Sequence, residues 1–107
     1  MDKVRQIRDL YEETRLQVVE ITHSQYAMAA VDAFFRRPII AGTVFAREAG
    51  FNHRVTANNM LRQLEGEGLI TRIREGSGRM AAIYALPRLI NIAEGRTVIR
   101  SSEPRLL

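Results

Sequence analysis

Residues 54–63, RVTANNMLRQ, carry side chains of the types that read DNA bases and phosphates. In the major groove, asparagine binds adenine through two hydrogen bonds, arginine binds guanine in the same way, and threonine contacts phosphates or the methyl group of thymine. If the segment is a helix, its apolar residues share one side and face the core, while its polar residues face outward. The inward-facing residues are Ala57, Met60, Leu61 and Leu64. The candidate DNA-contacting residues are Arg54, Thr56, Asn58, Asn59, Arg62 and Gln63.

A second group of arginines surrounds the glycine-rich turn EGSG at residues 75–78. The segments LITRIR before this turn and RMAAIYAL after it predict two antiparallel strands joined as a hairpin. Alternation along the first strand places Ile73, with Leu69 or Ile70, toward the core and the arginines toward solvent. Arg79 stands beside glycines that allow the backbone to approach a phosphate or the minor groove. The candidate DNA-contacting residues of the hairpin are Arg72, Arg74 and Arg79.

The same residues also fit a protein that does not bind DNA. Polar side chains on the outer face of a helix are normally only solvated. The region from Arg47 to Arg79 contains six arginines and four glutamates, a modest excess of positive charge. Three of these acids, Glu65, Glu67 and Glu75, would lie near a bound duplex and repel its phosphates. Protein interaction therefore remains an alternative to DNA binding.

No pattern in the sequence is typical of an enzyme, a metal site or a cofactor site. The chain has no cysteine, and His23 and His53 lack a second ligand at helical spacing. Ser24 and Ser77 have no neighbouring base that would activate a nucleophile. The turn at EGSGR lacks the third glycine and the strand-to-helix context of a phosphate-binding loop. We therefore expect a chain that is not an enzyme and that binds no metal or cofactor.

Helical segments are predicted on both sides of the candidate residues. The first has apolar side chains at alternating steps of three and four residues, from Val4 to Ile21. It packs either onto the rest of the chain or, as the alternative, onto a second copy of it. The second has Thr22 or Ser24 as its N-cap and ends at Pro38. The predicted helical segments are residues 2–22, 22–38, 42–50, 55–67 and 87–95.

The composition is that of one small globular domain. The 107 residues are 46% hydrophobic and 26% charged, which is ordinary for a globular protein. The longest apolar runs, MAAVDAFF and MAAIYALP, are far shorter than the roughly 20 residues that cross a membrane. The charged N-terminus has no apolar core of a signal peptide. With no cysteine, these features predict a cytoplasmic protein that is not attached to a membrane.

Positive charge is concentrated in the second part of the chain. The formal net charge is +4, and residues 38–107 carry ten arginines against six acids. Fifteen of the sixteen basic residues are arginine, which suits two-pronged contacts with phosphates and guanine. A genome rich in G+C is the alternative explanation for this preference.

The order of these elements predicts a mainly α fold with a small β-hairpin. Two helices joined by a glycine-containing turn and followed by a hairpin form a winged helix-turn-helix. The predicted organisation is a connector or extension helix at residues 1–22, a winged helix-turn-helix domain at residues 23–95 and a C-terminal tail at residues 96–107.

The sequence also resembles the C-terminal region of bacterial Fic-family proteins over roughly residues 10 to 96. The residues that carry the resemblance are His23, Ser24, Gln25, Phe35, Pro38, Thr56, Ala57, Asn58, Leu61, Leu64, Gly68, Gly78, Arg79, Tyr84, Pro87, Asn91, Ile92 and Ala93. Fic proteins of this kind are protein adenylyltransferases, which move AMP from ATP to a hydroxyl group of a target protein. Their catalytic loop, His-Pro-Phe-x-x-Gly-Asn-Gly-Arg, is absent here, and so is the Ser/Thr-x-x-x-Glu-(Gly/Asn) inhibitory motif.

The resemblance implies an accessory winged-helix module whose catalytic domain lies upstream in a longer protein. Its first helix would connect to that Fic catalytic domain, and no catalytic residue is carried over. The leading expectation is a module that binds double-stranded DNA. A protein-interaction, dimerisation or domain-positioning module is the alternative. A free-standing transcriptional repressor, dimeric and binding half-sites about one helical turn apart, is a third reading.

Overall fold

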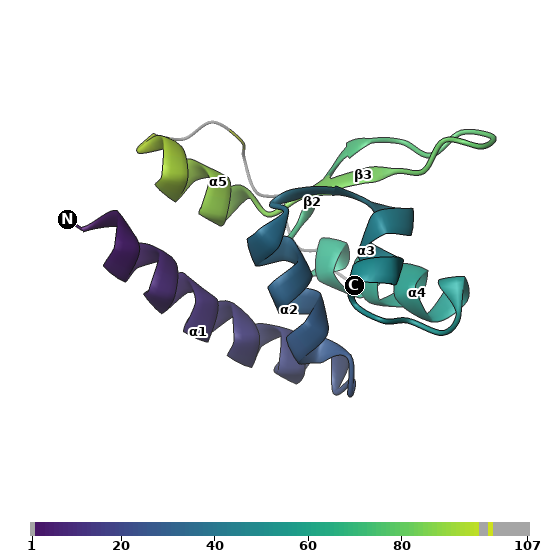
Figure 1. The fold of residues 1–107 in the computed structure, drawn as a ribbon, viewed down its shortest axis with the longest axis horizontal. Coiled ribbons are helices and arrows are strands. Elements are labelled where there is room, and N and C mark those ends of the chain that lie inside the picture. The colour runs from purple at the N-terminus through teal and green to yellow at the C-terminus, as the bar shows by residue number, and fades with distance from the viewer. Residues whose placement is uncertain (1, 97–98, 100–107) are drawn as a thin grey trace.

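The computed structural model describes residues 2–96 and residue 99. These residues form helices and a small antiparallel sheet, which confirms the mainly α fold class (Figure 1). The elements in chain order are α1 (Lys3–Thr22), α2 (Ala27–Arg36), β1 (Ile39–Ala41), α3 (Gly42–Glu48), α4 (Arg54–Gly66), β2 (Thr71–Arg74), β3 (Ile83–Ala85) and α5 (Pro87–Glu94). Among these residues, no helix combines the length and the apolar character needed to span a bilayer.

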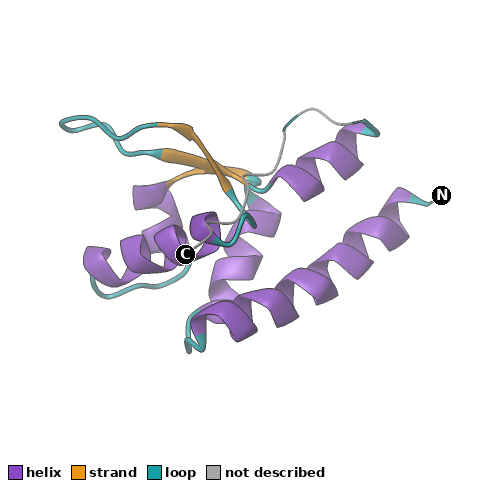
Figure 2. Ribbon diagram, turned by 180° about the vertical axis from the view of Figure 1, so that it is seen from behind, coloured by secondary structure: helices purple, strands orange, loops and turns teal. Residues whose placement is uncertain are grey.

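The sheet has three strands in the order β1-β3-β2, so it is larger than the predicted hairpin. The hairpin corresponds to β2 and β3, and β1 pairs with the other edge of β3 (Figure 2). Ile39 lies opposite Ala85, and Ala41 lies opposite Ile83. The amide of Gly42 then donates to the carbonyl of Ala82 over 2.9 Å. As a result, the beginning of α3 is fixed directly beside the hairpin.

The alternation predicted for β2 does not hold along the whole strand. The pairing of β2 with β3 shifts register between Arg72 and Arg74, because an extra residue interrupts the ladder. Ile73 consequently faces solvent with 45% of its surface exposed, so its predicted place in the core is wrong. Leu69 and Ile70, just before the strand, are the buried residues of this segment.

The core lies between the helices and the inner face of the sheet. Phe45 of α3 and Leu61 of α4 are completely buried at its centre. The four apolar residues predicted to face inward from α4 are all buried, which confirms the predicted orientation of that helix. Its closest helical neighbours are α3 and α1. The buried residues of α4 are Ala57, Met60, Leu61 and Leu64.

The start of α2 differs from the prediction. The N-cap position is Tyr26, so neither Thr22 nor Ser24 occupies it. Thr22 belongs to α1, where its hydroxyl donates to the carbonyl of Val18. The hydroxyl of Ser24 accepts a hydrogen bond from the amide of Tyr26 in the connection between the two helices. This connection turns at His23, whose φ of 48° is in the left-handed region.

The first helix packs onto the rest of the chain, mainly onto α2 and α5. Leu10, Thr14 and Val18 are buried on its inner side. The hydroxyl of Tyr11 donates to the carboxylate of Asp32 over 2.6 Å, and this hydrogen bond raises the pKa of Tyr11. Packing within the chain therefore accounts for most of the predicted apolar stripe. Its first member, Val4, is 71% exposed and takes no part.

An ion pair between α1 and α5 should make a small, pH-dependent contribution to stability. Arg88 donates to both carboxylate oxygens of Glu13, at 2.9 and 3.0 Å, and these hydrogen bonds hold the pKa of Glu13 below its ordinary value of 4.5. A lowered pKa in the folded state stabilises the protein above the unfolded pKa, and this stability is lost as the pH falls through the folded pKa. Both side chains are half exposed, so we expect Glu13→Gln to cost about 0.2–1 kcal/mol at neutral pH.

Urea unfolding of the wild type and of Glu13→Gln near pH 7 and well below pH 4.5 measures this effect. The difference between the two proteins should disappear at the acidic pH. An equal difference at both pH values would contradict the assignment to the ion pair.

The predicted C-terminal tail, residues 96–107, lies outside the described residues except for Arg96 and Ile99. The side-chain amide of Asn91 donates to the carbonyl of Ile99 over 2.8 Å, and its oxygen accepts from the amide of the same residue over 3.0 Å. Ile99 is therefore held by its backbone against α5.

Candidate nucleic-acid interface

The outer side of α4 is polar and accessible. Burial of its four inward residues leaves the other side of the helix facing away from the core. Asn58 is half-buried, and the remaining candidates on this helix are exposed. The exposed candidates are Arg54, Thr56, Asn59, Arg62 and Gln63. The structure therefore brings all six predicted residues of this segment to one accessible side, with Asn58 nearest to the rest of the protein.

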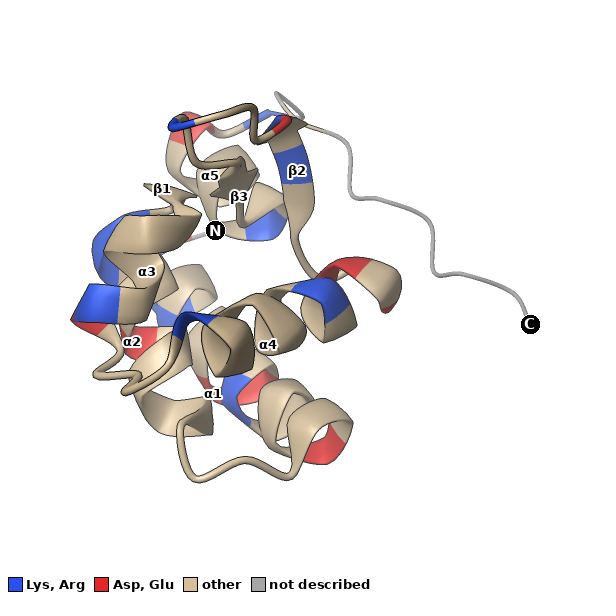
Figure 3. Cartoon of the chain, turned by 90° about the vertical axis from the view of Figure 1, so that its right-hand side faces the viewer, with Lys and Arg blue, Asp and Glu red and all other residues tan. Residues whose placement is uncertain are grey.

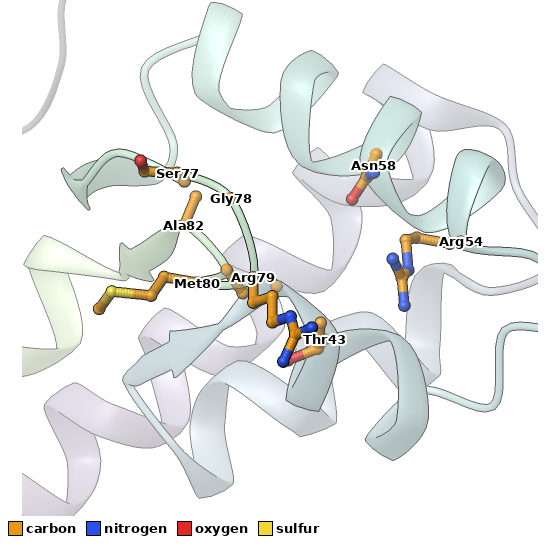
Figure 4. Close-up of a pocket in the computed structure, with 11 residues that line it drawn as sticks. Thr43, Arg54, Asn58, Ser77, Gly78, Arg79, Met80 and Ala82 are labelled. Carbon is orange, nitrogen blue, oxygen red and sulfur yellow. The ribbon is translucent and has the colours of Figure 1, made fainter.

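A cleft of about 630 Å³ separates the beginning of α4 from the hairpin turn (Figure 4). Arg54 and Asn58 border it from α4, and Arg79 points from the turn toward Thr43 at the beginning of α3. Two guanidinium groups from distant parts of the sequence thus border one concave surface. The full lining is Gly42, Thr43, Arg54, Asn58, Gly76, Ser77, Gly78, Arg79, Met80, Ala81 and Ala82.

The turn that carries Arg79 has a defined backbone. Ser77 and Met80 exchange two backbone hydrogen bonds of 2.9 Å, which close a two-residue loop of Gly78 and Arg79. Gly78 has a φ of 57°, and glycine at the first central position is typical of a type II′ turn. At Gly76, a Cβ atom would come within 3.2 Å of the backbone nitrogen of Ala82. The glycines predicted to shape this turn therefore have steric reasons to be there.

Arg72 differs from Arg54, Arg62 and Arg79 because its guanidinium forms ion pairs within the protein. It forms ion pairs with Glu65 at the end of α4, at 2.8 Å, and with Glu75 after β2, at 3.0 Å. It also lies over the ring of Tyr84, 5.5 Å from the centroid, as expected for a cation–π contact. Burial disfavours its charge, but the hydrogen bonds to Glu75 and Glu65 outweigh this and raise the pKa of Arg72. Arg72 therefore connects α4 to the sheet.

Arg74 is also engaged within the hairpin. Its guanidinium donates to the carbonyl of Ala81 over 2.8 Å and so joins the two sides of the hairpin. Arg74 remains exposed and can still present charge to a ligand. The alternation in the sequence predicts that Arg74 lies on a strand. It does not predict that the guanidinium already donates a hydrogen bond within the protein.

The acids that weakened the case for DNA binding are only partly neutralised. Glu65 and Glu75 share the single positive charge of Arg72, and Glu67 has no ion pair within the described residues. Arg54, Arg62 and Arg79 likewise form no ion pair with any residue in the described part of the chain. Figure 3 shows the basic segments on α4 and at the hairpin facing one side of the molecule, with acidic segments toward the end of α4. The beginning of α4 and the hairpin turn therefore form the positively charged end of this surface.

Among the cleft residues that were not sequence candidates are Thr43 and Met80. Thr43 reaches the cleft because β1 fixes the first turn of α3 beside the hairpin. Met80 follows Arg79 at the turn and is 56% exposed. A strand of three residues leaves no periodic signal, so the sequence alone does not place Thr43 near Arg79.

No model of a known protein family matches this chain, and no curated protein matches it in sequence. Within residues 2–96 and 99, no three histidine, aspartate or glutamate side chains gather in a way that could hold a metal ion. A functional assignment therefore depends on the geometry of α4, the cleft and the hairpin.

Proposed function

We propose that this chain is a winged helix-turn-helix module that binds double-stranded DNA. The element order supports it, since α3 and α4 are followed directly by the β2–β3 hairpin. The observation that carries the proposal is one surface with three arginines that lack ion pairs within the described residues, together with two asparagines. These residues are Arg54, Arg62, Arg79, Asn58 and Asn59.

In the proposed complex, α4 lies in the major groove and the hairpin turn lies over the adjacent sugar–phosphate backbone. A helix with its side chains is about 10–12 Å wide and fits a major groove of about 12 Å. Arg62 and Asn59, which are exposed along α4, would then contact base edges. Arg54 and Arg79 border the cleft from opposite sides, where each would donate hydrogen bonds to a different backbone phosphate.

Salt-dependent binding of a fluorescent duplex tests this proposal. Because Arg54 and Arg79 would each neutralise a phosphate, the logarithm of the binding constant should fall with the logarithm of the salt concentration with a slope of about −2, or about −0.9 per contact. We expect micromolar affinity at low salt, measured by fluorescence anisotropy. An absence of salt-dependent binding at micromolar protein would refute the proposed function.

By its resemblance to Fic-family proteins, we also infer that the module is an accessory part of a protein adenylyltransferase. The His-Pro-Phe-x-x-Gly-Asn-Gly-Arg loop is absent from the sequence, so the AMP-transfer chemistry would belong to another part of that protein. The gene sequence upstream of Met1 tests this inference directly. An upstream reading frame without that loop would contradict it.

Protein interaction is the second candidate function, and exposed apolar residues on α1 favour it. Leu16 is 61% exposed and Val19 is 42% exposed. Together with Leu69 they border a groove that also includes Glu20 and Glu67. Sedimentation velocity over a range of concentrations would detect self-association through this face. A monomer at every concentration would exclude a homodimer and leave only docking onto a different domain.

A further inference from the structure

The first turn of α4 presents an apolar side chain in the middle of its polar surface. Val55, the second residue of the helix, is 69% exposed, whereas its neighbours Arg54 and Thr56 are exposed and polar. A β-branched residue is a less favourable helix former than alanine, and in this position it gains little from burial. The fold therefore gives no evident reason for a valine here.

A single exposed valine is common on protein surfaces and would not by itself indicate a ligand. The spacing of its neighbours provides the second observation. Asn59 is four residues and Arg62 seven residues after Val55, so the three side chains follow one stripe of the helix. All three are exposed, and the stripe begins beside the cleft that Arg54 and Asn58 border.

The apolar group that base pairs present in the major groove is the 5-methyl group of thymine. An exposed apolar side chain such as Val55 can make a van der Waals contact with it. Adenine presents a donor and an acceptor that match the amide of Asn59. Residues four apart on a helix are separated by about 6 Å along the axis, which is close to two base-pair steps of about 3.4 Å each. A thymine and an adenine within two steps of each other can therefore meet Val55 and Asn59 together.

We propose that Val55 is a specificity-determining residue that reads the methyl group of a thymine, next to an adenine read by Asn59. This inference rests on the proposed DNA binding and adds the class of site that the module prefers. Arg54 and Arg79 supply affinity that does not depend on sequence, because they contact phosphates. Val55 and Asn59 supply the discrimination between sites.

The test begins with a selection from duplexes with a randomised central segment. The selected duplex is then compared with the same duplex carrying deoxyuridine in place of one thymine at a time, which removes only the methyl group. At one position, the wild type should lose about fourfold in affinity, which corresponds to the roughly 0.8 kcal/mol of one buried apolar carbon. At that position, Val55→Ala should show no difference between thymine and uracil.

Two further variants separate specificity from a general loss of binding. Asn59→Ala should keep the effect of uracil but lose the preference for the nearby adenine. Val55→Thr keeps the branched shape and one methyl group, so it should retain part of the effect. Val55→Ala places a better helix former at an exposed position, and its thermal unfolding should match that of the wild type.

The outcomes distinguish this inference from the proposed function. Salt-dependent duplex binding without any selected sequence, or with no effect of uracil at any position, overturns the reading of thymine and leaves DNA binding intact. An equal effect of uracil in the wild type and in Val55→Ala overturns the role of Val55. No binding to any duplex refutes both.

Discussion

The double variant Arg54→Ala/Arg79→Ala is expected to bind duplex DNA about 100-fold more weakly than the wild type at low salt. Each guanidinium would lose a charge-assisted hydrogen bond to phosphate, worth about 1.5 kcal/mol at the low end of the usual range, and every 1.4 kcal/mol is a factor of ten. The slope of the logarithm of affinity against the logarithm of salt should also become shallower by about 2, because two phosphate contacts are removed. Anisotropy titrations over a range of salt concentrations measure both quantities.

Arg8→Ala is the matched control for each of the single variants, Arg54→Ala and Arg79→Ala. Arg8 is exposed on α1, which lies at the opposite end of the molecule from the hairpin (Figures 1 and 3). The Arg8→Ala substitution removes one positive charge from the protein without changing the proposed interface. It should therefore leave the affinity for duplex DNA nearly unchanged. If Arg8→Ala weakens binding as much as either single variant of the cleft, the positive charge acts without a defined site and the docking geometry is wrong.

The variant Leu61→Ala is expected to lower the free energy of unfolding by about 2–5 kcal/mol. The side chain of Leu61 is completely buried, and its Cδ1 atom lies 3.6 Å from the position that a Cβ atom would take at Gly42. Truncation removes contacts between α4 and the beginning of α3 and leaves a cavity that neither helix can fill without moving. Small domains have total stabilities of only about 5–15 kcal/mol, so this is a large share.

Leu16→Ala provides the comparison with the same chemical change at a site that is 61% exposed. Surface substitutions of this kind usually change stability by less than about 0.5 kcal/mol. Urea unfolding followed by circular dichroism measures both variants against the wild type. Equal stability losses in the two variants would show that α4 does not pack as described.

Features with a strong local signal were predictable from the sequence. The apolar spacing and the terminal glycines predicted a helix at residues 55–67. The observed helix, α4, begins and ends one residue earlier, at Arg54 and Gly66. Its buried side follows from the helical period alone, so the accessibility of Asn59 and Arg62 could be predicted as well. The hairpin was predictable because Gly76 and Gly78 are needed by the turn itself.

Features that depend on contacts between distant residues were not predictable. β1 has only three residues, and it exists because β3 offers it a partner more than forty residues later. The register shift at Arg72 reverses the expected direction of Ile73. Likewise, the pairing of Arg72 with Glu65 depends on how α4 meets the sheet. Neither residue type nor spacing distinguishes Arg72 from Arg79, which has no ion pair within the described part of the chain.

The ion pairs of Arg72 have a consequence for the entropy of association. One guanidinium links the last turn of α4 to the segment after β2, and it lies over a ring of β3. The helix and the hairpin are thus held in a fixed mutual orientation before any ligand arrives. A partner that contacts both elements would not have to immobilise one relative to the other, and little conformational freedom would be lost on binding.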